Sequence, residues 1–250
     1  MEIWVHKSAL MHHLLHAVAT HGYIRHAAGS VTPKGVDAML ANMIRLYGIG
    51  HSPDKRWREK RAGRAGARLF LHPDYQEPVF RWWLLLSAGE HPALEREKVV
   101  DHGERRHRLT VFEQFEAVRQ PAPGGAPRWT WRITAEYYAM QQERIRTAIR
   151  LPDDRHQLEQ VLKSIHRFPG FRGVRNQVNE LRRFTVAEWE RSKRSSSGKP
   201  PLPNRVQGYV KPRVFPTVPL GEVRDRLLDG KPPFTVDQRQ ADTTKRAPAP

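Results

Sequence analysis

Histidines are the residues best suited to metal or acid–base chemistry in this sequence, and they crowd at one end. Six of the thirteen lie within the first 26 residues: His6, His12, His13, His16, His21 and His26. His12 and His16 are four residues apart, which lets two imidazoles reach one metal ion from a helix. A third ligand is required, yet no Asp or Glu occurs between Glu2 and Asp37. We therefore predict neither a metal site nor another cofactor, and interpret these histidines as a polar helix face.

Carboxylates that could bind Mg²⁺ in a nuclease are scattered along the sequence. The densest group, Asp101 and Glu104, directly precedes the arginines at 105, 106 and 108, so ion pairing on a solvated segment explains it. Neither a glycine-rich phosphate loop nor a Gly-x-Ser-x-Gly nucleophile motif occurs. On these grounds we predict no catalytic residue.

Metal-independent RNA cleavage stays open as an alternative. A histidine beside an arginine or lysine is sufficient for acid–base chemistry at a ribose 2′-hydroxyl. The candidates for that chemistry are His102 or His107 beside Arg105 and Arg106.

Arginine gives the stronger signal, and it points to phosphate. The chain has 43 basic and 26 acidic residues, a formal net charge of +17, and its basic residues divide into 32 Arg and 11 Lys. The guanidinium fork grips phosphate with two parallel hydrogen bonds and also stacks on bases. A GC-rich codon bias explains the preference for Arg over Lys but not the shortage of acids. Nucleic acid is therefore the favoured partner.

The predicted contacts fall in four basic segments, the densest of which runs from Ser52 to His72 and contains one acid between residues 55 and 68. The second segment, residues 105–108, lies in a charged stretch predicted as a solvated helix or loop, and the third, residues 172–183, lies on a predicted helix. The fourth, residues 128–132, lies on a predicted strand where arginines alternate with tryptophans. For the last helix, a solvated face is an equally good explanation of the arginines. The predicted nucleic-acid-binding residues are Lys55, Arg56, Arg58, Lys60, Arg61, Arg64, Arg68, Arg105, Arg106, Arg108, Arg128, Arg132, Arg172, Arg175, Arg182 and Arg183.

Periodicity places these residues on an α+β fold. Apolar residues at helical spacing predict two N-terminal helices, over 7–20 and 32–47, with a glycine-containing turn between them. That outline is loosely a helix-turn-helix unit, although its connection is longer than usual. Alternating patterns predict a four-stranded antiparallel sheet from residues 67–72, 79–87, 107–119 and 128–134. Three C-terminal helices follow, up to about residue 194. Trp129 and Trp131 are interpreted mainly as core residues.

Composition then suggests three regions. Residues 1–50 form a helical unit, 51–194 an α+β nucleic-acid-binding body, and 195–250 an extended Pro-rich tail whose end is disordered. The tail supports a further alternative, a structural subunit of a ribonucleoprotein complex that straps its spaced apolar residues along a partner. Those residues are Val210, Val214, Phe215, Val218 and Leu220.

The expected location is the cytoplasm, without membrane attachment. The sequence has no cysteine, which is compatible with a reducing compartment. No apolar run approaches the roughly 20 residues of a membrane helix, and the first residues lack the pattern of a signal peptide.

Five short stretches resemble proteins of bacterial plasmids and other mobile genetic elements. They are LYGIG (46–50), RAGRA (61–65), WWLLLSAGEH (82–91), WTWRIT (129–134) and FRGVRNQV (171–178), and the resemblance spans roughly residues 40–185. No activity is attached to that pattern, so it implies no catalytic residues. It implies a role in replication, transfer, transposition or element defence, and it slightly favours DNA over RNA as the partner.

Overall fold

The computed structural model describes residues 1–122, 124–150, 155–192, 198–203, 208–210 and 215–240. Its internal contacts divide the chain into two compact units. Unit 1 comprises Met1–Phe112 and Pro212–Pro250, and unit 2 comprises Glu113–Lys211. These boundaries differ from those expected after residues 50 and 194. The second N-terminal helix, the first hairpin and the C-terminal segment share one core, and the first helix contacts the same sheet, so they cluster together.

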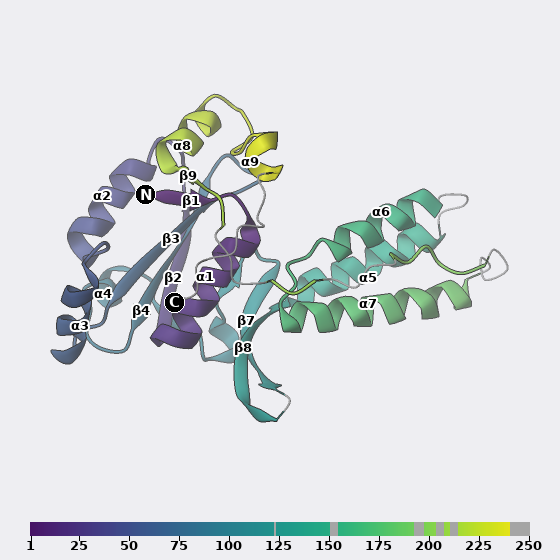
Figure 1. Cartoon of the computed structure of the whole chain (residues 1–250), viewed down its shortest axis with the longest axis horizontal. Coiled ribbons are helices and arrows are strands. Elements are labelled where there is room, and N and C mark those ends of the chain that lie inside the picture. Colours follow the sequence, from purple (N-terminus) through teal and green to yellow (C-terminus); the bar gives the residue numbers. More distant parts are fainter. Residues whose placement is uncertain (123, 151–154, 193–197, 204–207, 211–214, 241–250) are drawn as a thin grey trace. The chain divides into compact units, whose positions relative to one another are not determined.

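The α+β class with antiparallel sheets is confirmed. The larger sheet belongs to unit 1 and has the strand order β3-β4-β2-β5, with every neighbouring pair antiparallel. Figure 1 labels its three longer strands, β2, β3 and β4. The predicted hairpin of residues 67–72 and 79–87 is present as its first two strands. The strands of this sheet are β2 (Tyr23–Val31), β3 (Ala67–Pro73), β4 (Phe80–Ser87) and β5 (Val100–Asp101).

Strand β2 corrects the sequence-based expectation most strongly. Its residues were expected to form a turn between two helices, so the helix-turn-helix outline is wrong. The segment contains small residues because it packs tightly as a central strand. A Cβ atom placed on Gly29 would lie 2.7 Å from the Trp82 ring. Glycine is present here to make room for a neighbouring aromatic ring, not to turn the chain.

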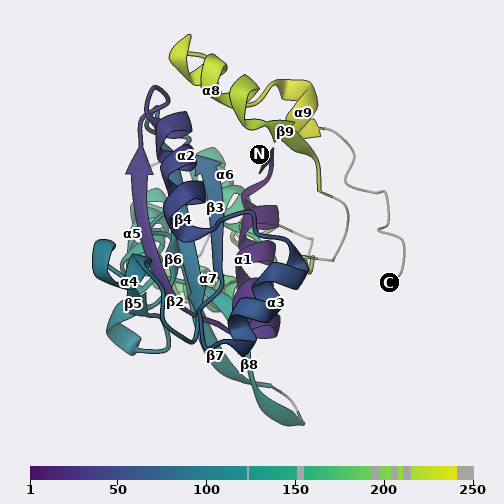
Figure 2. The same cartoon turned by 90° about the vertical axis from the view of Figure 1, so that its left-hand side faces the viewer.

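Helices cover both faces of this sheet. The helix α2 packs its Met43 and Tyr47 against one face, where Leu69 and Leu84 lie in the same core. Helix α1 covers the opposite face (Figure 2). On that face Phe70 and Trp4 stack. The two covering helices are α1 (Lys7–His21) and α2 (Val36–Tyr47). The shorter elements of this part are α3 (Pro53–Arg61), α4 (Ala93–Arg96), the 3₁₀ helix η1 (Arg105–His107) and β6 (Thr110–Val111).

Residues 215–240 are folded into unit 1, so the expected extended tail is wrong over this stretch. Strand β9 pairs antiparallel with β1, and the helix that follows buries an apolar face. The buried side chains of this segment are Val218 on the strand, Leu220, Val223 and Leu227 on the helix, and Phe234 beyond it. The predicted disorder of the last dozen residues falls almost entirely outside the described residues. The elements are β1 (Glu2–Trp4), β9 (Thr217–Pro219), α8 (Leu220–Leu228) and α9 (Val236–Gln240).

Unit 2 combines a hairpin with three helices packed side by side (Figure 1). The three helices are confirmed. The hairpin is a correction, because its strands do not continue the sheet of β3 and β4. The predicted strand 107–119 is broken at Phe112 and Glu113, whose φ angles are 53° and 59°. The elements are β7 (Phe115–Ala122), β8 (Gly125–Ile133), α5 (Ala135–Arg150), α6 (Arg155–His166) and α7 (Arg172–Arg191).

The first turn of helix α7 packs against strand β8. The backbone N–H of Gly173 donates to the Thr130 hydroxyl at 3.2 Å, and a Cβ there would lie 2.5 Å from the Trp131 carbonyl oxygen. Trp131 is fully buried, so its predicted core role is confirmed. Within the described ranges, no helix is both long enough and apolar enough to cross a lipid bilayer.

Candidate nucleic-acid interface

The basic segment around residue 55 forms the helix α3, as its sequence predicts. The Ser52 hydroxyl caps the helix by accepting the Lys55 backbone N–H at 3.3 Å, and Pro53 occupies the first turn. Apolar residues are nearly absent from this helix, so it presents most of its side chains to solvent. Five of the predicted contact residues lie on it: Lys55, Arg56, Arg58, Lys60 and Arg61.

Three cations from two elements meet around one concavity, which we call the cationic hollow. Arg56 and Lys60 come from α3, and Arg68 comes from the start of β3. The hollow has a volume of about 210 Å³. Its lining residues are His21, Tyr23, Arg56, Trp57, Lys60, Gly66, Arg68 and Ser87.

The sheet register builds the polar floor of the hollow. Tyr23, which opens β2, pairs with Ser87, which ends β4. The Ser87 hydroxyl accepts the Gly66 backbone N–H at 2.9 Å. A Cβ on Gly66 would lie 3.9 Å from the Tyr23 hydroxyl oxygen, so this hydroxyl lies beside Gly66, another lining residue. The lining therefore contains two hydroxyl-bearing residues together with the three cations.

No carboxylate neutralises this rim. The lining contains neither Asp nor Glu, and among the described residues no ion pair joins an acid to Arg56, Lys60 or Arg68. Burial lowers the pKa of Arg68, and the charge of Arg56 lowers it further. Clustered like charges without counter-ions cost stability, and a bound anion relieves that cost.

The positive charges of the hollow also act on His21. Partial burial lowers its pKa, and the further causes are the charges of four neighbours: His16, Arg68, Arg56 and Lys60. A depressed imidazole pKa means that the neutral form of His21 is favoured around neutral pH. The hollow thus holds a neutral base beside three fixed cations.

An exposed aromatic ring stands beside these charges. The Trp57 side chain is 58% exposed, an unusual position for a large apolar group. The Arg61 guanidinium lies 4.8 Å from its ring centroid, a cation–π distance. A tryptophan held in this way offers a flat surface on which a nucleobase can stack.

A second concavity beside α3 lacks these properties. It has a volume of about 280 Å³, and Glu59 and Glu90 lie in its lining together with Arg56 and Arg64. Glu59 is paired with His51 at 3.1 Å. Its two glutamates offset most of the charge of its three arginines, Arg45, Arg56 and Arg64, so it is a weaker site for an anion than the hollow.

The other predicted contacts of unit 1 lie elsewhere. Arg105 and Arg106 are on η1 and Arg108 follows it; Arg106 pairs with Glu104 at 3.0 Å. This pair matches the ion pairing expected for the acidic stretch. Arg58 donates to the Asp54 carbonyl oxygen at 3.4 Å.

In unit 2, most of the predicted arginines contact their own unit. Arg172 donates to the Gln120 carbonyl oxygen at 3.0 Å, and Arg132 pairs with Glu116 at 2.5 Å. Arg128 on β8 and Arg183 on α7 are exposed.

The other two α7 arginines bind the chain that follows the helix. Arg182 donates to the Pro203 carbonyl oxygen and approaches His166 Nε2, both at 2.9 Å. The Arg175 guanidinium lies 3.6 Å from the Tyr209 ring centroid. These side chains hold unit 2 together and are less available to a ligand.

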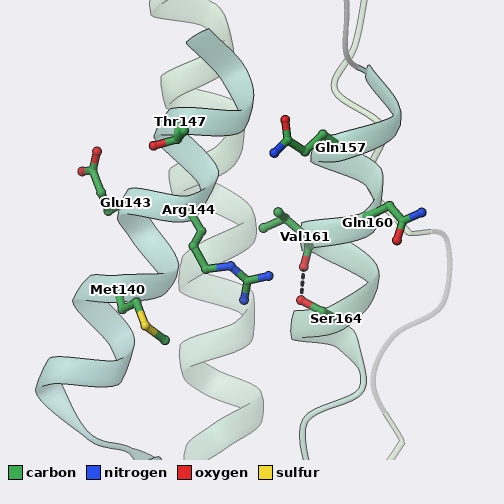
Figure 3. Close-up of a pocket in the computed structure, with 8 residues that line it drawn as sticks. All are labelled: Met140, Glu143, Arg144, Thr147, Gln157, Gln160, Val161 and Ser164. Carbon is green, nitrogen blue, oxygen red and sulfur yellow. Dashed lines mark hydrogen bonds between the residues drawn. The ribbon is translucent and has the colours of Figure 1, made fainter. Parts of the chain in front are cut away.

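A concavity in unit 2 lies between α5 and α6 and measures about 490 Å³ (Figure 3). Its one arginine, Arg144, donates to Gln141 at 2.9 Å, and Glu143 lies beside it. The facing side contributes uncharged groups such as Gln157 and Gln160. With one cation, one acid and no aromatic ring, this groove lacks the chemistry of a phosphate site.

The histidines of α1 are distributed between packing and the hollow. His13 stacks on Trp4 at 4.4 Å, and burial together with nearby charges lowers its pKa to about 4. Among the described residues, no three His, Asp or Glu side chains gather in a way that could hold a metal ion. His102, a candidate for acid–base chemistry, is only 2% exposed. His107 lies 3.4 Å from Glu104 on the exposed η1 segment.

Comparison with protein-family models, with curated proteins and with solved structures gave no match for this chain. The case for a function therefore rests on the geometry of its own residues.

Sequence reasoning found the three cations of the hollow but missed most of its other residues. Trp57 had a usable signal, since it sits within a basic helix four residues before Arg61. His21 belonged to the recognised histidine-rich end. Tyr23 and Ser87 had no local signal, because only the pairing of β2 with β4 brings them to the same place.

Proposed function

We propose that this chain is a nucleic-acid-binding protein and that the cationic hollow holds the backbone of a single strand. The observation that carries the proposal is the convergence of Arg56, Lys60 and Arg68 on one concavity without a carboxylate. Phosphate contacts supply most of the affinity of such proteins, and cations that are not paired with a carboxylate are available to make them.

The shape of the hollow favours a strand over a small ligand. A volume of about 210 Å³ is less than the 300–1,000 Å³ typical of pockets that enclose small molecules. It is adequate for a phosphate group with part of its sugar. Trp57 at the rim then offers a stacking surface for an adjacent base, which requires that base to be unpaired.

The alternative of a structural subunit that straps a partner with its tail is less well supported. Phe215, Val218 and Leu220 are buried within the chain itself, so they are not available to a partner. A role in a mobile genetic element stays a prediction from the resemblance alone.

The test is the salt dependence of binding to labelled 20-nucleotide single strands and duplexes. We expect the logarithm of the affinity to fall linearly with the logarithm of the salt concentration, by about 0.7–0.9 per phosphate contacted. The triple variant Arg56→Ala, Lys60→Ala, Arg68→Ala should reduce that slope by about 2–3 and the affinity by about 100-fold at low salt.

A control variant removes the same charge from exposed positions outside the hollow: Lys34→Ala, Lys98→Ala, Lys231→Ala. We expect it to weaken binding by about threefold or less. Equal losses in the two triple variants would mean that net charge alone drives binding. Absence of binding at low salt would end the proposal altogether.

A further inference from the structure

We propose that the cationic hollow also cleaves RNA, with His21 taking the proton of a ribose 2′-hydroxyl and Tyr23 protonating the leaving oxygen. This inference rests on the proposed function, because it requires a strand seated in the same hollow. It assigns a substrate class, single-stranded RNA, and an activity that needs no metal ion.

The two groups reach the hollow from the two ends of one tight connection. His21 is the last residue of α1, Gly22 turns the chain with a φ of 68°, and Tyr23 opens β2. Both side chains line the hollow. The left-handed glycine lets a helix end and a strand start present their side chains to the same space.

His21 is suited to act as a base because its surroundings oppose its protonation. The His16 ring lies 4.9 Å from it in an edge-to-face arrangement. The charged or titrating groups around it are His16 on α1, Arg56 and Lys60 on α3, and Arg68 on β3. Tyr23 on β2 lines the same hollow. Partial burial and these charges lower its pKa below the ordinary value of 6.5, so it is neutral and able to accept a proton at pH 7.

Tyr23 is suited to donate a proton. Its ring is buried, with 8% of the residue exposed, while its hydroxyl lies close to Gly66 at the floor of the hollow. The buried ring fixes the position of the hydroxyl. Substituting phenylalanine removes the proton donor and keeps the ring, which makes the role of Tyr23 directly testable.

The reaction balances without an added reactant. The 2′-oxygen attacks the adjacent phosphorus as His21 takes its proton, and the bond from phosphorus to the 5′-oxygen breaks. The 5′-oxygen receives the proton of the Tyr23 hydroxyl. The products are a 2′,3′-cyclic phosphate and a free 5′-hydroxyl, and proton exchange with water returns both side chains to their starting states.

The cations complete the chemistry. Negative charge builds up on the phosphate oxygens as the fifth bond to phosphorus forms, and fixed cations placed there stabilise it. Arg68 is half-buried and adjoins Tyr23, so it is placed to hold the reacting phosphate, while Arg56 and Lys60 hold the strand. The candidates suggested by sequence, His102 and His107, lie outside this cluster.

The experiment uses the full chain, excess EDTA, and 5′-labelled RNAs of 30 nucleotides, both unstructured pools and hairpins with single-stranded flanks. We expect fragments with a 2′,3′-cyclic phosphate and a 5′-hydroxyl. His21→Ala should slow cleavage by about 100-fold or more, and Tyr23→Phe by about 10- to 100-fold. Both variants should bind RNA within about threefold of the unmodified protein, since they keep Arg56, Lys60 and Arg68.

The matched control is His156→Gln, which removes an exposed histidine of α6 in unit 2 and should leave the rate unchanged. A 2′-deoxy substitution at the cut position should abolish cleavage without loss of binding. Intact RNA that is bound by the protein overturns the cleavage inference and leaves the binding proposal standing. Cleavage that persists in His21→Ala, or products with a 3′-hydroxyl, also overturns it. RNA that is neither bound nor cut contradicts the binding proposal instead.

Discussion

The arginines of the cationic hollow and those of α7 look alike in sequence but differ in what they contact. Arg56 and Arg68 line an open concavity that has no acid. Arg172 and Arg182 donate to carbonyl oxygens of their own unit, at 3.0 and 2.9 Å. A guanidinium that is already hydrogen-bonded within the protein must lose those bonds before it can bind phosphate. Arg68 does have an aromatic partner, since its guanidinium lies 4.9 Å from the Phe70 ring centroid, but within the described part of the chain neither Arg56 nor Arg68 is paired with a carboxylate. The local density of positive charge is therefore a weaker guide to a binding surface than the absence of internal hydrogen-bond and carboxylate partners.

The largest effect is expected from replacing three arginines of α7, which should lower the stability of unit 2 with little effect on nucleic-acid binding. The triple variant Arg172→Ala, Arg175→Ala, Arg182→Ala removes two sets of charged hydrogen bonds and one cation–π contact. We expect it to lower the free energy of unfolding of unit 2 by about 4 kcal/mol. Nucleic-acid affinity, measured where the variant is folded, should change by about threefold or less.

Hydrogen exchange read out by mass spectrometry reports the stability of each unit separately. The opposite result is expected for the hollow variant Arg56→Ala, Lys60→Ala, Arg68→Ala, which should lose much of its nucleic-acid affinity and little stability. If the α7 variant loses as much affinity as the hollow variant, the contrast between the two regions is wrong.

The next largest effect is the loss of stability of unit 1 in acid, which we expect because unit 1 buries histidines such as His72. His72 is fully buried in unit 1, and burial lowers its pKa from 6.5 to about 4. A base with a depressed folded pKa stabilises the fold above its unfolded pKa, and that stability is lost as the pH falls from 6.5 towards 4. The loss for His72 is about 3 kcal/mol by linkage. His26, whose pKa is also lowered to about 4, adds to it.

Acid should therefore unfold unit 1 before unit 2, as measured by hydrogen exchange between pH 7 and 4. The variant His72→Leu removes one titrating group at similar volume and should make unit 1 less sensitive to acid by about 3 kcal/mol. An unchanged acid midpoint in this variant would show that His72 does not contribute. Simultaneous unfolding of both units at every pH would show that they unfold cooperatively.

The smallest expected effect is on the affinity for single strands, when Trp57 or Trp129, each beside an arginine, is replaced by alanine. Trp57→Ala should weaken binding of single strands by about tenfold, because stacking contributes about 1–3 kcal/mol per base. The affinity for duplexes should stay the same, and so should stability, because this side chain is 58% exposed. Trp129→Ala in unit 2 should leave single-strand binding unchanged. Trp57→Phe retains an aromatic surface and should recover most of the affinity.

Much of the helical structure was predictable because helix signals are local. Residues 7–20 and 32–47 show apolar spacing on one face, and Ser52 followed by Pro53 marks the start of α3. The three helices of unit 2 follow the same rule. The excess of positive charge, and three of the cations in the hollow, were also evident from composition and spacing.

Sequence patterns failed where distant segments pair. Strand β2 contains Ala27, Ala28 and Gly29, which have little preference for strands, and becomes a strand because β4 and β5 flank it. The C-terminal segment looked like an isolated tail, yet Val218 pairs with Ile3 across the whole length of the chain. Hydrogen bonding between strands carries no signature in a single local window.

The sequence by itself therefore determined the α+β class, most helices and the cationic character of this protein, since each depends on neighbouring residues or on totals. Only the tertiary structure decided which cations matter. It joined Arg68 on β3 to Arg56 on α3, placed His21 and Tyr23 beside them, and left no carboxylate in the lining. The physical reason is that a binding site depends on distances between residues far apart in the chain, which the register of the sheet sets.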